Sequence, residues 1–150
     1  MSEPKATAPL AGPETRLGDL ALRAPVRVPW SATLQDAAAT MAVHDVSSVL
    51  VGAGAVLLTE RDLARAYSVG LGPESGVVEV ATPVPCTAAG VSTVLAATRL
   101  MLQHHVRHLV ITGPAGDVVG VVSLRALARI LMRSMDPGGW ACLLDAVEQL

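Results

Sequence analysis

The feature that most constrains the fold is an internal repeat with a period of about sixty residues. Thr59 and Ser123 each end an apolar run, each precede an arginine by two positions, and lie 64 positions apart. Upstream, residues 41–51 match residues 101–111 at an offset of 60. The offset grows by four because the turn at Gly52–Gly54 is shorter than its counterpart, a change that surface hairpins tolerate. The chain is therefore expected to contain two copies of one unit that share a core.

Each repeat predicts the same order of elements: an extended lead-in, a helix, two strands joined by a hairpin, and a second helix. In the first repeat we expect a lead-in at 25–29, a helix at 34–45, strands at 46–51 and 55–58, and a helix at 60–69 closed by Gly70. In the second repeat we expect a lead-in at 82–86, a helix at 94–104 capped by Ser92 or Thr93, strands at 107–112 and 118–122, and a helix at 124–135. The expected fold class is α/β (α+β).

The same pattern divides the chain into five segments. Residues 1–14 are rich in Pro, Ala and Thr and are expected to be disordered. They are followed by the first repeat at 15–70, a linker at 71–76, the second repeat at 77–135 and a tail at 136–150. The tail is expected to be helical, because its apolar residues have helical spacing: Trp140, Leu143, Leu144 and Val147. This stripe could pack on the core, which we favour, or form a dimer contact.

The composition argues against several classes of protein. Of 150 residues, 51% are hydrophobic, yet there is no Phe, so the core must be built from Val, Leu, Ala and Met. A net charge of −2 without a basic run gives no electrostatic reason to expect nucleic acid binding. No apolar run reaches the roughly 18 residues of a membrane span, and the N-terminus lacks the apolar core of a signal peptide, so a cytoplasmic protein is expected. Cys86 and Cys142 are expected to be free thiols, although a disulfide between them stays open.

Thr59 and Asp62 form the pattern with the most specific functional interpretation. An apolar run ends in Thr59, and Asp62 follows three residues later at the start of a helical pattern. One interpretation is a capping box, in which the hydroxyl and the carboxylate satisfy backbone N–H groups at the helix start. The other is a nucleotide site, because the same two groups beside a helix N-terminus can both hydrogen-bond a ribose diol. From these residues alone the capping box is favoured.

The remaining polar residues predict neither a metal site nor an enzyme. His104 and His108 have the spacing of helical metal ligands, but the helix should end near His105, and no acidic or thiol residue completes a set nearby. The sequence contains no nucleophile elbow, no Gly-rich phosphate loop and no pair of carboxylates in a plausible cleft.

Taken in order, the repeated motifs resemble those of a tandem cystathionine-beta-synthase (CBS) domain pair, also called a Bateman module. The resemblance covers residues 17–134 and rests on these segments: Val26–Val28, His44–Ser48, Leu57–Leu63, Thr82–Val84, His105–Leu109 and Gly120–Ser123. In size the chain resembles the small stand-alone bacterial pairs. The resemblance implies two repeats related by a pseudo-twofold axis, with clefts between them, and a protein that senses ligands rather than catalysing a reaction.

The resemblance also implies a ligand and where it would bind. Family members bind adenosine nucleotides such as AMP, ADP or ATP, or S-adenosylmethionine, and many pairs form homodimers that regulate a partner protein. Carried over to this sequence, Thr59 and Asp62 would hold the ribose. Val26 and Val28, in the lead-in of the same repeat, would line the adenine.

The phosphate and the second cleft follow from the same resemblance. Arg107 or His108 would meet the phosphate, because arginine offers a fork for phosphate oxygens and histidine gains charge as the pH falls. Ser123 matches the hydroxyl position of the second repeat, but Ala126 stands at the carboxylate position and cannot accept ribose hydrogen bonds. The second cleft, near Ser123 and Val84, is therefore expected to be degenerate, which leaves one standard site per chain.

Two functions remain as predictions. The first is a regulatory module that senses an adenosine nucleotide in the cleft between the repeats. The alternative is a ligand-free interaction module, in which Thr59 and Asp62 only cap a helix and both clefts are degenerate. The particular nucleotide, the regulated partner and the orientation of the dimer do not follow from the sequence.

Overall fold

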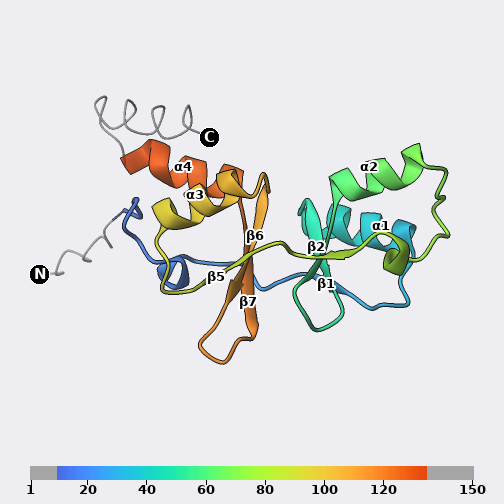
Figure 1. The fold of residues 1–150 in the computed structure, drawn as a ribbon, viewed down its shortest axis with the longest axis horizontal. Helices are drawn as coiled ribbons and strands as arrows, with labels where there is room; N and C mark the ends of the chain where they lie inside the picture. The colour runs from blue at the N-terminus through green and yellow to red at the C-terminus, as the bar shows by residue number, and fades with distance from the viewer. Residues whose placement is uncertain (1–9, 135–150) are drawn as a thin grey trace, which may run out of the picture.

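A computed structural model describes residues 10–134, which form two repeats of helices and strands (Figure 1). The first repeat contains β1 (Arg27–Val28), α1 (Leu34–His44), β2 (Ser48–Val51), β3 (Val56–Thr59) and α2 (Glu60–Ser68). The second contains β5 (Thr87–Ala89), α3 (Val94–Gln103), β6 (His108–Thr112), β7 (Val118–Ser123) and α4 (Leu124–Ser134). The 3-10 turn η1 (Leu17–Asp19) precedes the first repeat, and η2 (Val77–Glu79) and β4 (Thr82–Pro83) lie between the two. The predicted order of elements and the mixed α/β class are confirmed.

The helices begin where the sequence predicts, because hydroxyl side chains cap their first turns. Thr33 precedes α1 and Thr59 precedes α2, each in a capping box closed by the aspartate three residues later. Thr93 caps α3 through its side-chain oxygen. Beyond α1, Asp45 has a φ of 51°, and beyond α3, His105 has a φ of 53°. The two helix ends therefore share one left-handed geometry at equivalent positions, as copies of a single unit should.

The strands form two small sheets, in the orders β1-β2-β3-β4 and β5-β6-β7. β1 is parallel to β2 and β5 is parallel to β6, whereas the hairpin pairs β2–β3 and β6–β7 are antiparallel. Val28 pairs with Val51, and Ala88 pairs with Ile111. The second sheet therefore repeats the register of the first at the 60-residue offset.

The lead-in of the second repeat differs from the prediction. The strand that pairs with β6 is β5 at 87–89, whereas the predicted segment 82–86 supplies β4 to the edge of the first sheet, where Thr82 pairs with Leu57. Pro83 and Pro85 explain the difference, because a proline has no N–H for a strand ladder and is therefore suited to a sheet edge. The segment before the second repeat thus crosses to the first repeat.

Each repeat has its own apolar core, and a third cluster joins them. Most buried core side chains are Val, Leu, Ala or Met, as the composition requires. Leu50 and Leu57 of the first sheet are buried with Val110 of the second sheet in the third cluster. In Figure 1 the two sheets accordingly face each other in the middle of the molecule, with α1 and α2 beyond one sheet and α3 and α4 beyond the other.

Several predictions concern residues outside 10–134: the disorder of residues 1–9, the helical tail at 136–150 and the pairing of Cys142. The end of the predicted disordered segment is ordered, because Pro13 O accepts a 3.0 Å hydrogen bond from Leu95 N. No helix among the described residues is long and apolar enough to cross a membrane.

Candidate functional site

A cleft of about 200 Å³ lies between the two repeats. One wall is the junction of β3 and α2, with Thr59 and Asp62. The opposite wall is the segment 105–108, which leads into β6 of the second repeat. The crossing segment 82–85 forms the remaining side. The cleft therefore brings together polar residues from both repeats.

Thr59 and Asp62 form a closed capping box at the edge of this cleft. Asp62 Oδ2 accepts hydrogen bonds from Thr59 N at 2.9 Å and from Thr59 Oγ1 at 2.6 Å. Asp62 N donates in return to Thr59 Oγ1 at 3.3 Å. Within the described residues, both bonds to the carboxylate go to Oδ2. A ligand hydroxyl could therefore bind Oδ1 without opening the box, so capping and ligand binding are compatible.

Arg107 and His108 stand on the opposite wall. His108 Nε2 lies 2.8 Å from Ser47 Oγ of the first repeat, and both side chains are half-buried. Burial lowers the pKa of His108, and the neighbouring Arg107 lowers it further, while Glu60 and Asp62 oppose the shift. His108 is therefore a neutral ring at neutral pH, and Arg107 supplies the positive charge of this wall.

Val26 and Val28 lie elsewhere. Val28 is buried in the core of the first repeat, and Val26 packs against the same cluster, so neither is among the residues that line the cleft of Thr59. Val84, predicted near the second cleft, lines the first cleft instead. The crossing of segment 82–85 is the physical reason, because it brings the lead-in of one repeat to the site of the other.

The sequence reading missed three basic residues of the cleft: Arg61, Arg65 and His105. Arg61 and Arg65 are one helical turn apart on α2, so they lie on the same side as Asp62. Their spacing was a signal, but a pair of arginines on a helix is most often a solvated face. The cleft thus holds arginines on both walls and a single carboxylate, Asp62.

In the second repeat, the site equivalent to that of Thr59 and Asp62 has fewer polar groups. Ser123 Oγ accepts a 3.2 Å hydrogen bond from Ala126 N, which is half of a capping box without a carboxylate. At the 60-residue offset, Ser47 and Ser48 stand where Arg107 and His108 stand in the cleft. The second position therefore lacks the acid of the first and the two basic residues of its opposite wall, whereas Arg125 and Arg129 stand 64 positions after Arg61 and Arg65.

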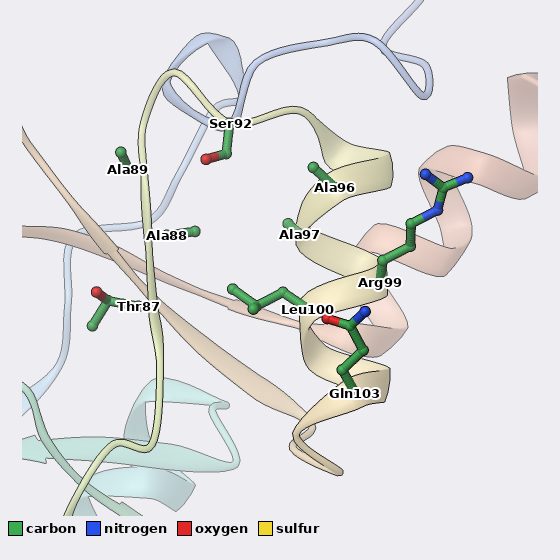
Figure 2. Close-up of a pocket in the computed structure, with 9 residues that line it drawn as sticks. All are labelled: Thr87, Ala88, Ala89, Ser92, Ala96, Ala97, Arg99, Leu100 and Gln103. Carbon is green, nitrogen blue, oxygen red and sulfur yellow. The ribbon is translucent and has the colours of Figure 1, made fainter. Parts of the chain in front are cut away.

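A larger pocket of about 400 Å³ lies between β5 and α3 (Figure 2). Its walls are mostly small side chains, with Ala88 and Ala97 facing each other across it. Arg99 is the charged residue of its lining, and in Figure 2 its side chain points away from β5. Within residues 10–134, no group of His, Cys, Asp or Glu could hold a metal ion. The cleft between the repeats is the better candidate, because it alone of the two pockets combines an acid, a hydroxyl and several cations.

Comparisons with known proteins agree with this architecture. The CBS domain family matches residues 77–133. A CBS domain protein from Pyrobaculum aerophilum, solved in complex with AMP, is 26% identical, with a TM-score of 0.69 over 80% of this chain and 100% of that chain. An uncharacterised conserved protein from Pyrococcus horikoshii is 23% identical, with a TM-score of 0.73 over 83% of this chain and 97% of that chain.

A CBS domain pair solved with 5′-methylthioadenosine and S-adenosyl-L-methionine is 19% identical, with a TM-score of 0.69 over 79% of this chain and 96% of that chain. No curated protein sequence matches the chain. The family match covers the second repeat, and the first repeat has the same elements in the same register. The second repeat therefore matches the CBS domain family, and the chain has the fold of a CBS domain pair.

Proposed function

We propose that the chain is a regulatory module that binds one adenosine nucleotide in the cleft between its repeats. The observation that carries this proposal is the presence of Thr59 and Asp62 in the same cleft as Arg107. A hydroxyl and a carboxylate suit a ribose diol, and an arginine fork suits a phosphate. The relative from Pyrobaculum aerophilum that was solved with AMP supports this ligand class.

The crossing segment would contact the base. Pro83 and Pro85 have no N–H, and Val84 N already donates to Ala55 O at 3.1 Å. The backbone of residues 83–85 therefore offers the ligand carbonyl acceptors but no free donor. Such a wall suits a base that brings its own donor, as the 6-amino group of adenine does. Aliphatic side chains such as Val84 would cover the face of the ring.

Regulation follows from the position of the cleft. A ligand that contacts both α2 of the first repeat and the start of β6 in the second repeat binds most tightly at one particular distance between these two elements. Occupancy can then shift a conformational equilibrium by the difference in its affinity for the two states. Such a module acts by sensing rather than by catalysis, and we propose that it forms a homodimer that passes this shift to a partner protein.

The alternative is a ligand-free interaction module. It is favoured by the second position, where Ala126 replaces the carboxylate, and by the exposed apolar side chains on helices of the first repeat. Val43 on α1 is 81% exposed and Tyr67 on α2 is 58% exposed. In this alternative Thr59 and Asp62 serve only as a capping box.

Thermal unfolding against AMP, ADP, ATP, S-adenosylmethionine and NAD tests the two functions. A ligand at about a hundred times its Kd should stabilise the fold by about 2.7 kcal/mol, which is a shift of several degrees in Tm. Asp62→Ala should abolish the shift. Asp36→Ala is the matched control, because Asp36 closes the same type of box on α1 but is not part of the cleft lining.

The comparison separates the capping role from the binding role. Both variants lose the acid of a capping box, so both should unfold at a lower temperature than the wild type. Only Asp62→Ala should also lose the ligand-induced shift relative to its own ligand-free value. A shift that survives in Asp62→Ala contradicts the ribose assignment, and no shift with any ligand in the wild type favours the interaction module.

A further inference from the structure

Ser47 and His108 connect the two repeats at the cleft. The 2.8 Å contact joins Ser47 Oγ, in the loop before β2, to His108 Nε2, in the first residue of β6. Ser47 is also tied to the cleft through its backbone, because Ser47 O accepts a 3.1 Å hydrogen bond from Glu60 N at the start of α2. The His108 ring is therefore held from the first repeat while it lines the cleft from the second.

The charged groups around this ring come from several elements. Arg107 adjoins it on β6, and Glu60 and Asp62 act on it from α2. Arg61, Arg65 and His105 line the same cleft, and Ser123 of β7 is the strand partner of His108. Burial and Arg107 together keep the pKa of His108 below its usual value despite the two carboxylates. The ring is consequently neutral in the empty cleft at neutral pH.

A phosphate changes this balance. A dianion beside His108 favours the imidazolium form by direct charge attraction. In that form both ring nitrogens are donors, so Nε2–H can donate to Ser47 Oγ while Nδ1–H is free to donate to a phosphate oxygen. The contact with Ser47 thus keeps the ring in place in both protonation states.

We propose that ligand binding in this cleft is coupled to proton uptake at His108, so that the cleft selects a ligand with a dianionic phosphate and binds it more tightly as the pH falls. This inference rests on the proposed function and adds its regulation. Between the free and the ligand-bound titration ranges of His108, affinity should decrease by up to about tenfold for each unit rise in pH. S-adenosylmethionine and 5′-methylthioadenosine carry no phosphate and should show no such coupling.

The phosphate itself titrates in the opposite sense. Its second pKa is about 6, so binding of the dianion to a cationic cleft releases a small fraction of a proton at neutral pH. Uptake at His108 and release from the phosphate therefore differ in sign. The net number of protons exchanged at pH 7 identifies which group dominates.

Isothermal titration calorimetry in buffers of different ionisation enthalpy measures this number directly. The wild-type protein is titrated at pH 7 with AMP and with adenosine, and His108→Gln and Ser47→Ala are titrated with AMP. We expect net proton uptake with AMP, none with adenosine, and none in His108→Gln. Ser47→Ala keeps the titratable ring and should retain uptake, although with weaker binding.

The outcomes separate this inference from the proposed function. AMP binding to the wild type with no uptake, or with net release, overturns the inference and leaves the proposed function standing. No binding of AMP or adenosine to the wild type removes both. Uptake that persists in His108→Gln assigns the proton to another group and also overturns the inference. The wild-type comparison of AMP with adenosine needs no variant, so it holds even if His108→Gln folds poorly.

Discussion

Leu17 and Val77 lie 60 positions apart, Leu17 shortly before the first repeat and Val77 shortly before the second, and each is fully buried in the core of the other repeat. Leu17 N donates to Ser92 O at 2.8 Å in the second repeat, and Val77 N donates to Ala32 O at 3.0 Å in the first. The two 3-10 turns are therefore exchanged between the repeats. Each repeat needs a segment from the other to complete its core, so the pair should fold as one unit.

Leu17→Ala tests this exchange. The side chain is fully buried in the second core, so its removal should lower the free energy of unfolding by about 2–5 kcal/mol. Leu10→Ala is the control, since Leu10 is 82% exposed and its replacement should change stability by at most about 0.5 kcal/mol. Urea denaturation followed by circular dichroism measures both. Equal effects of the two substitutions would contradict the burial of Leu17.

The exchange also shows what the sequence could and could not predict. The helices and strands follow from local patterns, because caps such as Thr33 and Thr59 and the alternation of apolar residues act within a few positions. A repeat period, however, is the same whether a lead-in packs on its own repeat or on the other one. Periodicity alone therefore could not place Leu17 or Val84 correctly.

The candidate site likewise contains residues that local sequence patterns could predict and residues that they could not. Thr59 and Asp62 were predictable because their relation is local, and Arg107 and His108 because the repeat places them at a strand start. Val26 and Val28 stay with their own repeat, but β1 and β4 lie at opposite edges of the first sheet, and the cleft is lined by residues 82–85 next to β3 instead. Tertiary contacts that depend on which segment crosses are thus beyond a reading of one sequence.

The hairpin between β2 and β3 provides a matched pair of glycines. Gly52 has a φ of +66°, and a Cβ there would lie 2.2 Å from Trp30 Nε1. Arg27 Nη1 also donates to Gly52 O at 2.7 Å, so the backbone at this position is held in place. Gly54 has open space and no positive φ. The first glycine is therefore required by the structure and the second is not.

Gly52→Ala should destabilise the protein by at least about 1–2 kcal/mol, which is the steric penalty of a left-handed residue with a Cβ. Displacement of Trp30 should add to this loss and change its fluorescence. Gly54→Ala should have little effect or stabilise slightly, because alanine reduces the entropy of the unfolded chain. Urea denaturation of both variants checks the order. If Gly54→Ala were less stable than Gly52→Ala, this account of the turn would be refuted.

The burial of His108 predicts a pH dependence of stability. Its folded-state pKa lies below the unfolded value of about 6.5, so the unfolded chain binds more protons between these two values. The stability that the neutral ring permits is therefore fully present above about pH 6.5 and is lost as the pH falls toward the folded-state pKa.

His108→Gln should remove this part of the acid destabilisation. The measurement is the free energy of unfolding of wild type and variant from pH 5 to 8, with the difference above pH 7.5 as the reference. The two curves should converge or cross toward acid pH, since only the wild type must bury a charge there. Parallel curves over the whole range would show that the His108 ring is not desolvated in solution.

The Ala126→Asp substitution tests whether restoring the carboxylate is enough to restore nucleotide binding in the second repeat. The new carboxylate would stand three residues after Ser123, whose hydroxyl already accepts from the backbone N–H of residue 126, and would complete a second capping box on α4. A negative charge at a helix N-terminus typically contributes about 0.3–1 kcal/mol, so the variant should be more stable than the wild type. Ala126→Asn is the control that supplies an acceptor without charge. The stoichiometry of AMP should nevertheless stay at one per chain by calorimetry, because Ser47 and Ser48 stand where Arg107 and His108 stand in the first cleft. A second equivalent of AMP bound by Ala126→Asp would show that adding the acid is sufficient, and that Arg107 and His108 opposite Asp62 are not needed for binding.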